Sequence, residues 1–247
     1  MDSGLAAVAA PRDDQGVGRR TMKVLCTNGV KAVTAELIPA VERTIGLSVD
    51  VDYGSTNLLL EKIAKGETGD LAVLSAEAID DLIEKGAIQK GSRVDLAKSS
   101  IGVAVRRGAI GPDISTVDAL KAALLAAKSV MYSKTGISGV YVPQLMLKLG
   151  IANQMVQKVV NPSYGTVGEA LARGEAEIAL QQISELLPVP GIKVVGPVPS
   201  QVQLVTVFSA GTFAAAVEPR AARMLVGELT TNAARSLYTA KGLEPAF

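Results

Sequence analysis

From Met22 onward, short apolar runs alternate with longer segments whose apolar residues recur at helical spacing. In residues 30–46, Val33, Leu37, Val41 and Ile45 follow an i, i+4 pattern, and Gly46 provides a stop signal. The same reasoning predicts strands at 23–26, 47–53 and 70–75, and further helices at 57–66 and 76–86. This alternation is typical of an α/β fold.

A second, similar unit follows. Strands are predicted at 99–108, 130–133 and 177–181, and helices at 113–129, from Ser138 onward, and from Thr166 to Gly174. Capping boxes are expected at Ser115–Asp118 and Thr166–Glu169. Pro143 sets the helix start near Ser138, because proline is tolerated in or near a first helical turn. Residues 189–211 read as an extended return, followed by helices at 216–231 and 232–242.

This order predicts two lobes joined by two crossovers, with a cleft between them. We expect the first lobe to comprise residues 22–107 and 202–247, and the second lobe residues 108–201. Residues 1–21 are expected to be a disordered extension or a mis-annotated start, with a processed leader as the alternative. They do not resemble a signal peptide, and no apolar run is long enough to span a membrane.

Composition narrows the possible chemistry. The 25 Lys and Arg residues balance 24 Asp and Glu residues, and aromatic residues make up only 3%, so neither nucleic acid nor an anionic membrane is the expected partner. The chain has no His, which excludes Ser-His-Asp triads, Cys-His dyads and imidazole metal sites. No metal or cofactor is predicted, and the single Cys26 is expected to be a buried core residue.

Three predicted strand-to-helix turns carry small polar residues, namely Thr27, Asn28 and Gly29, then Ser55 and Thr56, then Ser75. In a parallel sheet such turns meet at one edge, where ligands bind. Helix N-termini offer unpaired N–H groups and a partial positive charge, so these turns together predict an anion site. The alternative is that these residues serve only as helix N-caps.

The segments "KVLCTNGVKAV", "YGSTNLLLEKIAKGETGDLAVLSAEAIDDL", "GISGVYVPQL" and "RGEAEIALQQISELLPVPG" resemble the type II periplasmic substrate-binding proteins, specifically the molybdate-binding group of ABC transporters. The resemblance covers about residues 22–247 and implies a two-lobed α/β fold with a ligand cleft between the lobes. It also implies a small anionic ligand and a transporter component in the membrane as partner.

Carried over residue by residue, the family's site falls on both lobes. It comprises Asn28, Gly29, Ser55, Thr56, Ser138, Thr166, Val167 and Gln182. Gly29 and Gln182 replace positions that usually bear a hydroxyl and a Tyr in molybdate binders. Two hydroxyl donors are therefore missing from an oxyanion cage, and a planar carboxylate suits the remaining amide and backbone donors at least as well.

The resemblance also extends to aconitate isomerase, which implies an enzyme as the alternative: a cofactor-independent proton shift on an unsaturated carboxylate. Such chemistry needs a positioned base and donors for the developing enediolate charge. Candidate proton carriers are Tyr53, Lys134, Tyr164 and Glu185, each of which could instead be solvated or packed. Lys98, Arg106 and Lys134 could anchor further carboxylates or be simply exposed.

The leading hypothesis is a binding protein, because the site residues that the family resemblance supports are hydrogen-bond donors rather than acid–base groups. As written, the chain is expected in the cytoplasm, or in the periplasm if a leader is missing. An intracellular ligand sensor is a third option, although no DNA-binding helix pair is apparent. We expect Thr56→Ala and Ser138→Ala each to weaken binding by about 1–2 kcal/mol.

Overall fold

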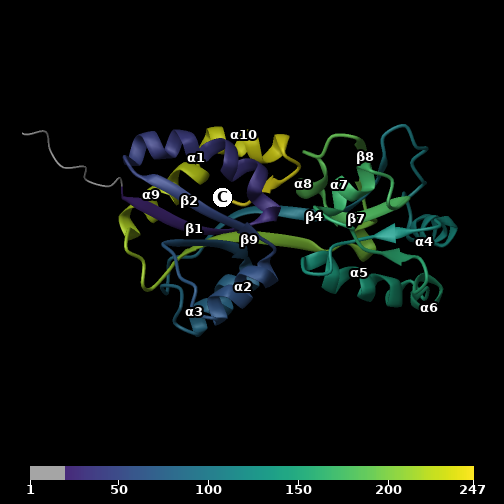
Figure 1. Ribbon diagram of the computed structural model, residues 1–247, viewed down its shortest axis with the longest axis horizontal. Helices are drawn as coiled ribbons and strands as arrows, with labels where there is room; N and C mark the ends of the chain where they lie inside the picture. Colours follow the sequence, from purple (N-terminus) through teal and green to yellow (C-terminus); the bar gives the residue numbers. More distant parts are fainter. Residues whose placement is uncertain (1–19) are drawn as a thin grey trace, which may run out of the picture.

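A computed structural model describes residues 20–247 as two α/β units lying side by side along the long axis of the molecule (Figure 1). The first-lobe elements before the crossover are β1 (Thr21–Thr27), η1 (Asn28–Val30), α1 (Lys31–Ile45), β2 (Ser48–Gly54), α2 (Thr56–Ala64), β3 (Leu71–Ser75) and α3 (Ala76–Glu84). The predicted extension at 1–21 lies almost wholly outside the described residues, and β1 already begins at Thr21.

The second lobe contains α4 (Val117–Ala126), β5 (Val130–Met131), α5 (Ile137–Lys148), α6 (Ala152–Met155), β6 (Val159–Val160), α7 (Val167–Ala172), β7 (Ile178–Gln182), α8 (Ile183–Leu186), β8 (Ile192–Pro197) and η2 (Ser200–Val202). The chain then returns through β9 (Val205–Thr212) to α9 (Pro219–Leu229), α10 (Asn232–Ala240) and β10 (Glu244–Pro245). The strand at β10 was not expected from the sequence.

One long strand, β4 (Val94–Arg106), belongs to both lobes. Its first part, through Ser100, pairs with β9, and from Ile101 onward it pairs with β7 and β8. The strand order is β2-β1-β3-β9-β4-β7-β5-β6, with β8 and β10 also paired to β4. From the sequence this strand was predicted to start at residue 99, because the charged residues before that position interrupt the apolar pattern of its first half. The lobe boundaries themselves stay predictions.

Each face of the first-lobe sheet is covered by its own helices (Figure 1). Val24 and Cys26 on β1 point toward α1, α9 and α10, whereas Leu25 between them points toward α2 and α3. This is the two-residue alternation of a strand buried on both faces. A separate core, which includes Ile101 and Leu145, fills the second lobe.

Several local expectations are confirmed and two are corrected. Ser75 and Thr166 cap helices, and Thr166 with Glu169 forms the predicted capping box. At α4, however, the cap is Thr116, whose Oγ1 accepts from the Ala119 N–H at 3.1 Å, so the box predicted from Ser115 is wrong. The start of α5 is near Ser138 as predicted, but Pro143 lies past its first turn.

Pro143 costs helix α5 one backbone hydrogen bond. Proline has no N–H, so the Gly139 carbonyl lacks its usual partner four residues later, and packing of α5 against the second-lobe core outweighs that lost bond. No helix in the described part of the chain is long and apolar enough to cross a membrane.

Candidate functional site

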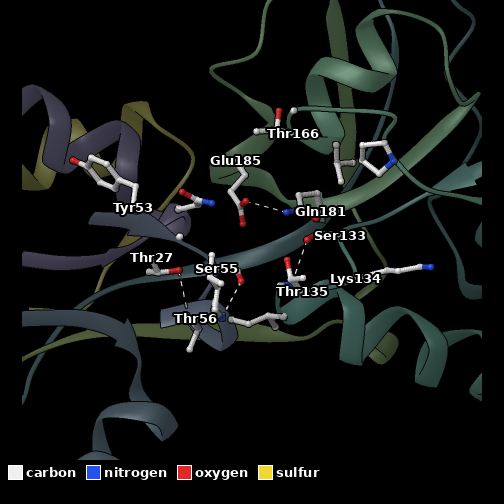
Figure 2. A pocket seen from close by; sticks show the side chains of 18 of the residues that line it. Thr27, Tyr53, Ser55, Thr56, Ser133, Lys134, Thr135, Thr166, Gln181 and Glu185 are labelled. Atoms are coloured by element: carbon white, nitrogen blue, oxygen red, sulfur yellow. Dashed lines mark hydrogen bonds between the residues drawn. The ribbon is translucent and has the colours of Figure 1, made fainter. Parts of the chain in front are cut away.

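A cavity of about 470 Å³ lies between the lobes, at the edge where the parallel strands end. In the first lobe, β1 and β2 lead into it through Thr27, Asn28, Ser55 and Thr56. In the second lobe the loops after β5 and β6 supply its opposite wall, together with the end of β7 and α8. Figure 2 shows these side chains facing one another across the gap.

Four helix or 3-10 segments begin at this cavity: η1 leading into α1, then α2, α5 and α7. Ser55 and Thr166 accept from backbone N–H groups of α2 and α7, so those two starts are capped within the protein. No side chain caps the segments that begin after Thr27 and Gly136. Apart from the Gly139 N–H, which donates to the Gly136 carbonyl at 2.9 Å, their first-turn N–H groups can meet an anion in the cavity.

The ionisable group that faces the cavity most directly is Glu185. Its carboxylate points toward the gap between Ser55 and Thr166, and Gln181 Nε2 donates to its Oε2 at 2.9 Å (Figure 2). Burial raises the pKa of Glu185 from 4.5 to about 6, and the bond from Gln181 partly opposes this rise in pKa. A carboxyl group with such a pKa can both accept and return a proton near neutral pH.

Gln181 is itself held by Ser138. The Ser138 hydroxyl, almost fully buried, donates to Gln181 Oε1 at 2.7 Å, which leaves the Gln181 amide nitrogen free to face Glu185. Ser138, Gln181 and Glu185 thus form a hydrogen-bonded chain from α5 through β7 to α8. Ser138 does not line the cavity, so it reaches the site through Gln181.

The structure brings together six of the predicted ligand contacts. Around the cavity lie Thr27, Asn28, Ser55, Thr56, Thr166 and Val167. Gly29, Ser75 and Gln182 lie outside its wall: Ser75 caps α3, and Gln182 Nε2 donates to Thr206 Oγ1 at 2.9 Å within the crossover.

Position 29 has no room for a side chain, so it requires a glycine. A Cβ on Gly29 would lie 2.1 Å from Cζ of Phe208, and Phe208 is part of the cavity wall. The aromatic ring therefore occupies the space that a hydroxyl-bearing side chain at position 29 would need. In this chain the first-strand turn can offer only backbone groups at that point.

The other candidate proton carriers are less well placed. The Tyr53 ring lines the cavity, but its hydroxyl lies 3.0 Å from Thr34 Oγ1, and burial raises the Tyr53 pKa. Lys134 lines the rim and its ammonium group extends away from Glu185 (Figure 2). Tyr164 is 67% exposed and stacks under Arg173, outside the cavity wall.

The two further cations proposed as anchors also lie elsewhere. Lys98 Nζ is 3.0 Å from Glu244 Oε1 on β10, and Arg106 lies at the far end of β4, beside a different hollow. Among the described residues, no group of three or more His, Cys, Asp or Glu side chains could hold a metal ion.

Sequence reasoning missed part of the second-lobe wall. The additional lining residues there are Ser133, Thr135, Gly136, Ile137, Asn161, Pro162, Gly165 and Gln181. Ser133 ends the strand predicted at 130–133, and Thr135 and Gly136 come just after it, so the rule used for the first lobe would have found them. Asn161 and Pro162 follow β6, which has two residues and no recognisable strand signal.

The fold and the interlobe cavity define a two-lobed solute-binding protein. The chain belongs to the bacterial extracellular solute-binding protein family, whose model matches residues 22–244. It is 36% identical over 231 residues to an aconitate isomerase from Pseudomonas sp., covering 91% of this chain and 88% of that protein.

Solved structures share the architecture. The periplasmic molybdate-binding protein of Azotobacter vinelandii matches with a TM-score of 0.73 at 17% identity, over 90% of this chain and 98% of that one. The sulfate-binding protein of Mycobacterium tuberculosis matches with a TM-score of 0.74 at 16% identity, over 92% and 88% of the two chains. At these identities the likeness concerns the fold.

Proposed function

We propose that this chain binds an unsaturated organic polycarboxylate between its lobes and isomerises it by a cofactor-independent proton shift. The observation that carries this proposal is the Glu185 carboxyl group, which faces a cavity whose other polar groups are mostly hydroxyls, amides and helix N-termini. In a site devoted only to holding an anion, a carboxylate repels the ligand. In a site for proton transfer, a carboxyl group with a pKa of about 6 is the required acid and base.

The reaction conserves atoms and electrons. The Glu185 carboxylate takes a proton from the carbon next to a substrate carboxylate, and the electron pair left behind spreads over the allylic system onto carboxylate oxygens. The N–H groups at the starts of η1 and α5 stabilise that charge, as oxyanion donors do. Protonated Glu185 then returns the proton to the other allylic carbon, and the double bond moves.

The relationship to an aconitate isomerase supports a polycarboxylate with an allylic C–H as the substrate class. Cavity size is compatible with it, because about 470 Å³ falls within the range of small-molecule sites. Several helix N-termini supply positive potential for more than one carboxylate.

A second candidate is a receptor that delivers an anion to a membrane transporter, with location outside the cytoplasm. The observation favouring it is the set of neutral donors on both lobes, which suits capture of an oxyanion or carboxylate without chemistry. The family to which the chain belongs is described as extracellular and solute-binding, which supports the same reading.

The two candidates separate in one experiment. Purified protein is incubated in deuterated buffer with cis- or trans-aconitate and followed by proton NMR, while thermal shifts are recorded with these ligands, citrate, sulfate and molybdate. We expect interconversion of the aconitate isomers by the wild type and none by Glu185→Gln, with ligand binding retained in that variant. Binding without interconversion by the wild type would contradict the isomerase and leave the receptor.

A further inference from the structure

A second cavity, of about 320 Å³, lies behind Glu185 on the side of the cleft formed by α1. Its walls are the first turns of α1, the start of α7 and the segment after α8, which lie on the same side of the sheets (Figure 1). We call it the rear cavity. It shares Asn28, Thr166, Val167, Gln181 and Glu185 with the ligand cavity. Glu185 therefore stands between the two spaces and contributes to the wall of each.

The rear cavity has both apolar and polar walls and leaves room for water beside Glu185. It is roomy compared with the ~30 Å³ that one water molecule occupies in the liquid. Polar side chains of its wall are Glu185, Lys31, Ser184 and Glu169; Ser184 Oγ also lies 3.2 Å from Ser99 Oγ, and Glu169 Oε2 accepts from the Thr166 N–H at 2.7 Å. Small side chains, including Ala32 and Ala35 of α1, keep the space open between them.

From this arrangement we propose that the rear cavity connects Glu185 to bulk water while a ligand fills the ligand cavity. The inference rests on the proposed function. A ligand in the ligand cavity would cover the side of Glu185 that faces that cavity and would leave the side that faces the rear cavity uncovered. The proton that Glu185 removes from carbon therefore exchanges with solvent before it is returned.

The exchange itself is a balanced step. Glu185 in its carboxylic acid form gives its proton to a water molecule of the rear cavity and receives another from it, with no change in charge. A carboxyl group with a pKa near neutrality exchanges its proton far faster than typical enzymes turn over. Contact between Glu185 and water therefore decides whether the product carries a solvent hydrogen or the substrate's own. The charged groups beside this route are Lys31 on α1 and Glu169 on α7.

Filling the rear cavity tests the idea. Ala35→Leu places a larger side chain at an exposed position of α1 that lines the rear cavity but not the ligand cavity. Ala40→Leu, at an exposed position of the same helix that lines neither cavity, is the matched control. Both proteins are given an aconitate isomer in deuterated buffer, and the deuterium content of early product is measured by NMR or mass spectrometry.

We expect wild type and Ala40→Leu to place solvent deuterium at the new C–H in nearly every turnover. Ala35→Leu should retain the substrate's own hydrogen in a several-fold larger fraction of product. Equal deuterium content in Ala35→Leu and Ala40→Leu, with turnover preserved, would overturn the proposed route while leaving the isomerase intact.

A second readout needs no turnover. Carbon-13 labelling of glutamate carboxyls, with the Glu185 signal assigned through Glu185→Gln, gives the pKa of Glu185 directly. Removing water behind this carboxyl in Ala35→Leu should raise its pKa above that in Ala40→Leu, because desolvation disfavours the charged form. Identical Glu185 pKa values in the two variants would overturn the rear-cavity route, even if the wild type isomerises nothing.

Discussion

Gln181 Nε2 donates a hydrogen bond of 2.9 Å to Oε2 of Glu185, and this bond joins the end of strand β7 to the short helix α8. A donor at this place stabilises the ionised carboxylate and opposes the effect of burial on its pKa. The Gln181 amide therefore sets where Glu185 titrates as well as where its carboxylate points.

Replacing Gln181 by Met should raise the pKa of Glu185 above about 6, since the donor is lost while the burial remains. The acid limb of the pH–rate profile should then move to higher pH, because ionised Glu185 is the base. Gln201→Met, at an exposed position, is the control and should leave the profile in place. An unmoved acid limb in Gln181→Met would contradict the role assigned to this bond.

Glu185→Gln should stabilise the free protein at mildly alkaline pH. Burial raises the folded-state pKa from 4.5 to about 6, so ionised Glu185 destabilises the fold above that range by at most about 2 kcal/mol. The penalty decreases as pH falls through about 6 and vanishes below 4.5, where the carboxyl is protonated in both states. Urea unfolding across this range measures it.

The exposed Glu61→Gln on α2 serves as the control for that change and should not give the same pH-dependent gain. A gain for Glu185→Gln that is the same at all pH values would mean that packing, not ionisation, causes it.

Binding of an anionic ligand should tighten as pH falls through about 6, because protonation of Glu185 removes its repulsion. In Glu185→Gln the affinity should be high already and show no step in this range. Calorimetric titration with citrate, for which ligand protonation is corrected, gives the comparison. A step that persists in the variant would assign it to another group.

Thr56→Ala should weaken ligand binding by about 1–2 kcal/mol, since Thr56 lines the cavity and its hydroxyl, which donates weakly to Thr27 Oγ1 at 3.4 Å, can turn to a charged ligand. Thr44→Ala on α1, away from the cavity, is the matched control. Ser138→Ala should instead reduce turnover more than affinity, because Ser138 reaches the cavity only through Gln181. Equal losses of affinity in Thr56→Ala and Ser138→Ala would mean that Ser138 contacts the ligand itself.

Gly29→Ser should destabilise the protein by about 1–3 kcal/mol, because its side chain would overlap the Phe208 ring. Adding Phe208→Leu should recover part of that loss by making room. Gly227→Ser on α9, where a Cβ would meet nothing within 4 Å, controls for the change of residue type. Full stability in Gly29→Ser would show that Phe208 moves aside without cost.

Much of the fold and half of the site follow from local rules that the sequence obeys. The helix starts at Ser55, Ser75 and Thr166 can be recognised in the sequence, because at each one a hydroxyl side chain accepts from a backbone N–H three residues later. Strand alternation and helical spacing also predict which faces are buried. Parallel strands then carry their end turns to one edge, so the first-lobe wall could be placed from the chain alone.

Tertiary structure decided what local rules leave open. Gln181 and Gln182 are neighbours at a strand end, where successive side chains point to opposite faces, so register alone determines that Gln181 reaches the cavity and Gln182 the crossover. Phe208, distant in sequence, closes the space beside Gly29. Glu185 acquires its raised pKa from burial between lobes, which is a property of the assembled fold and not of any segment.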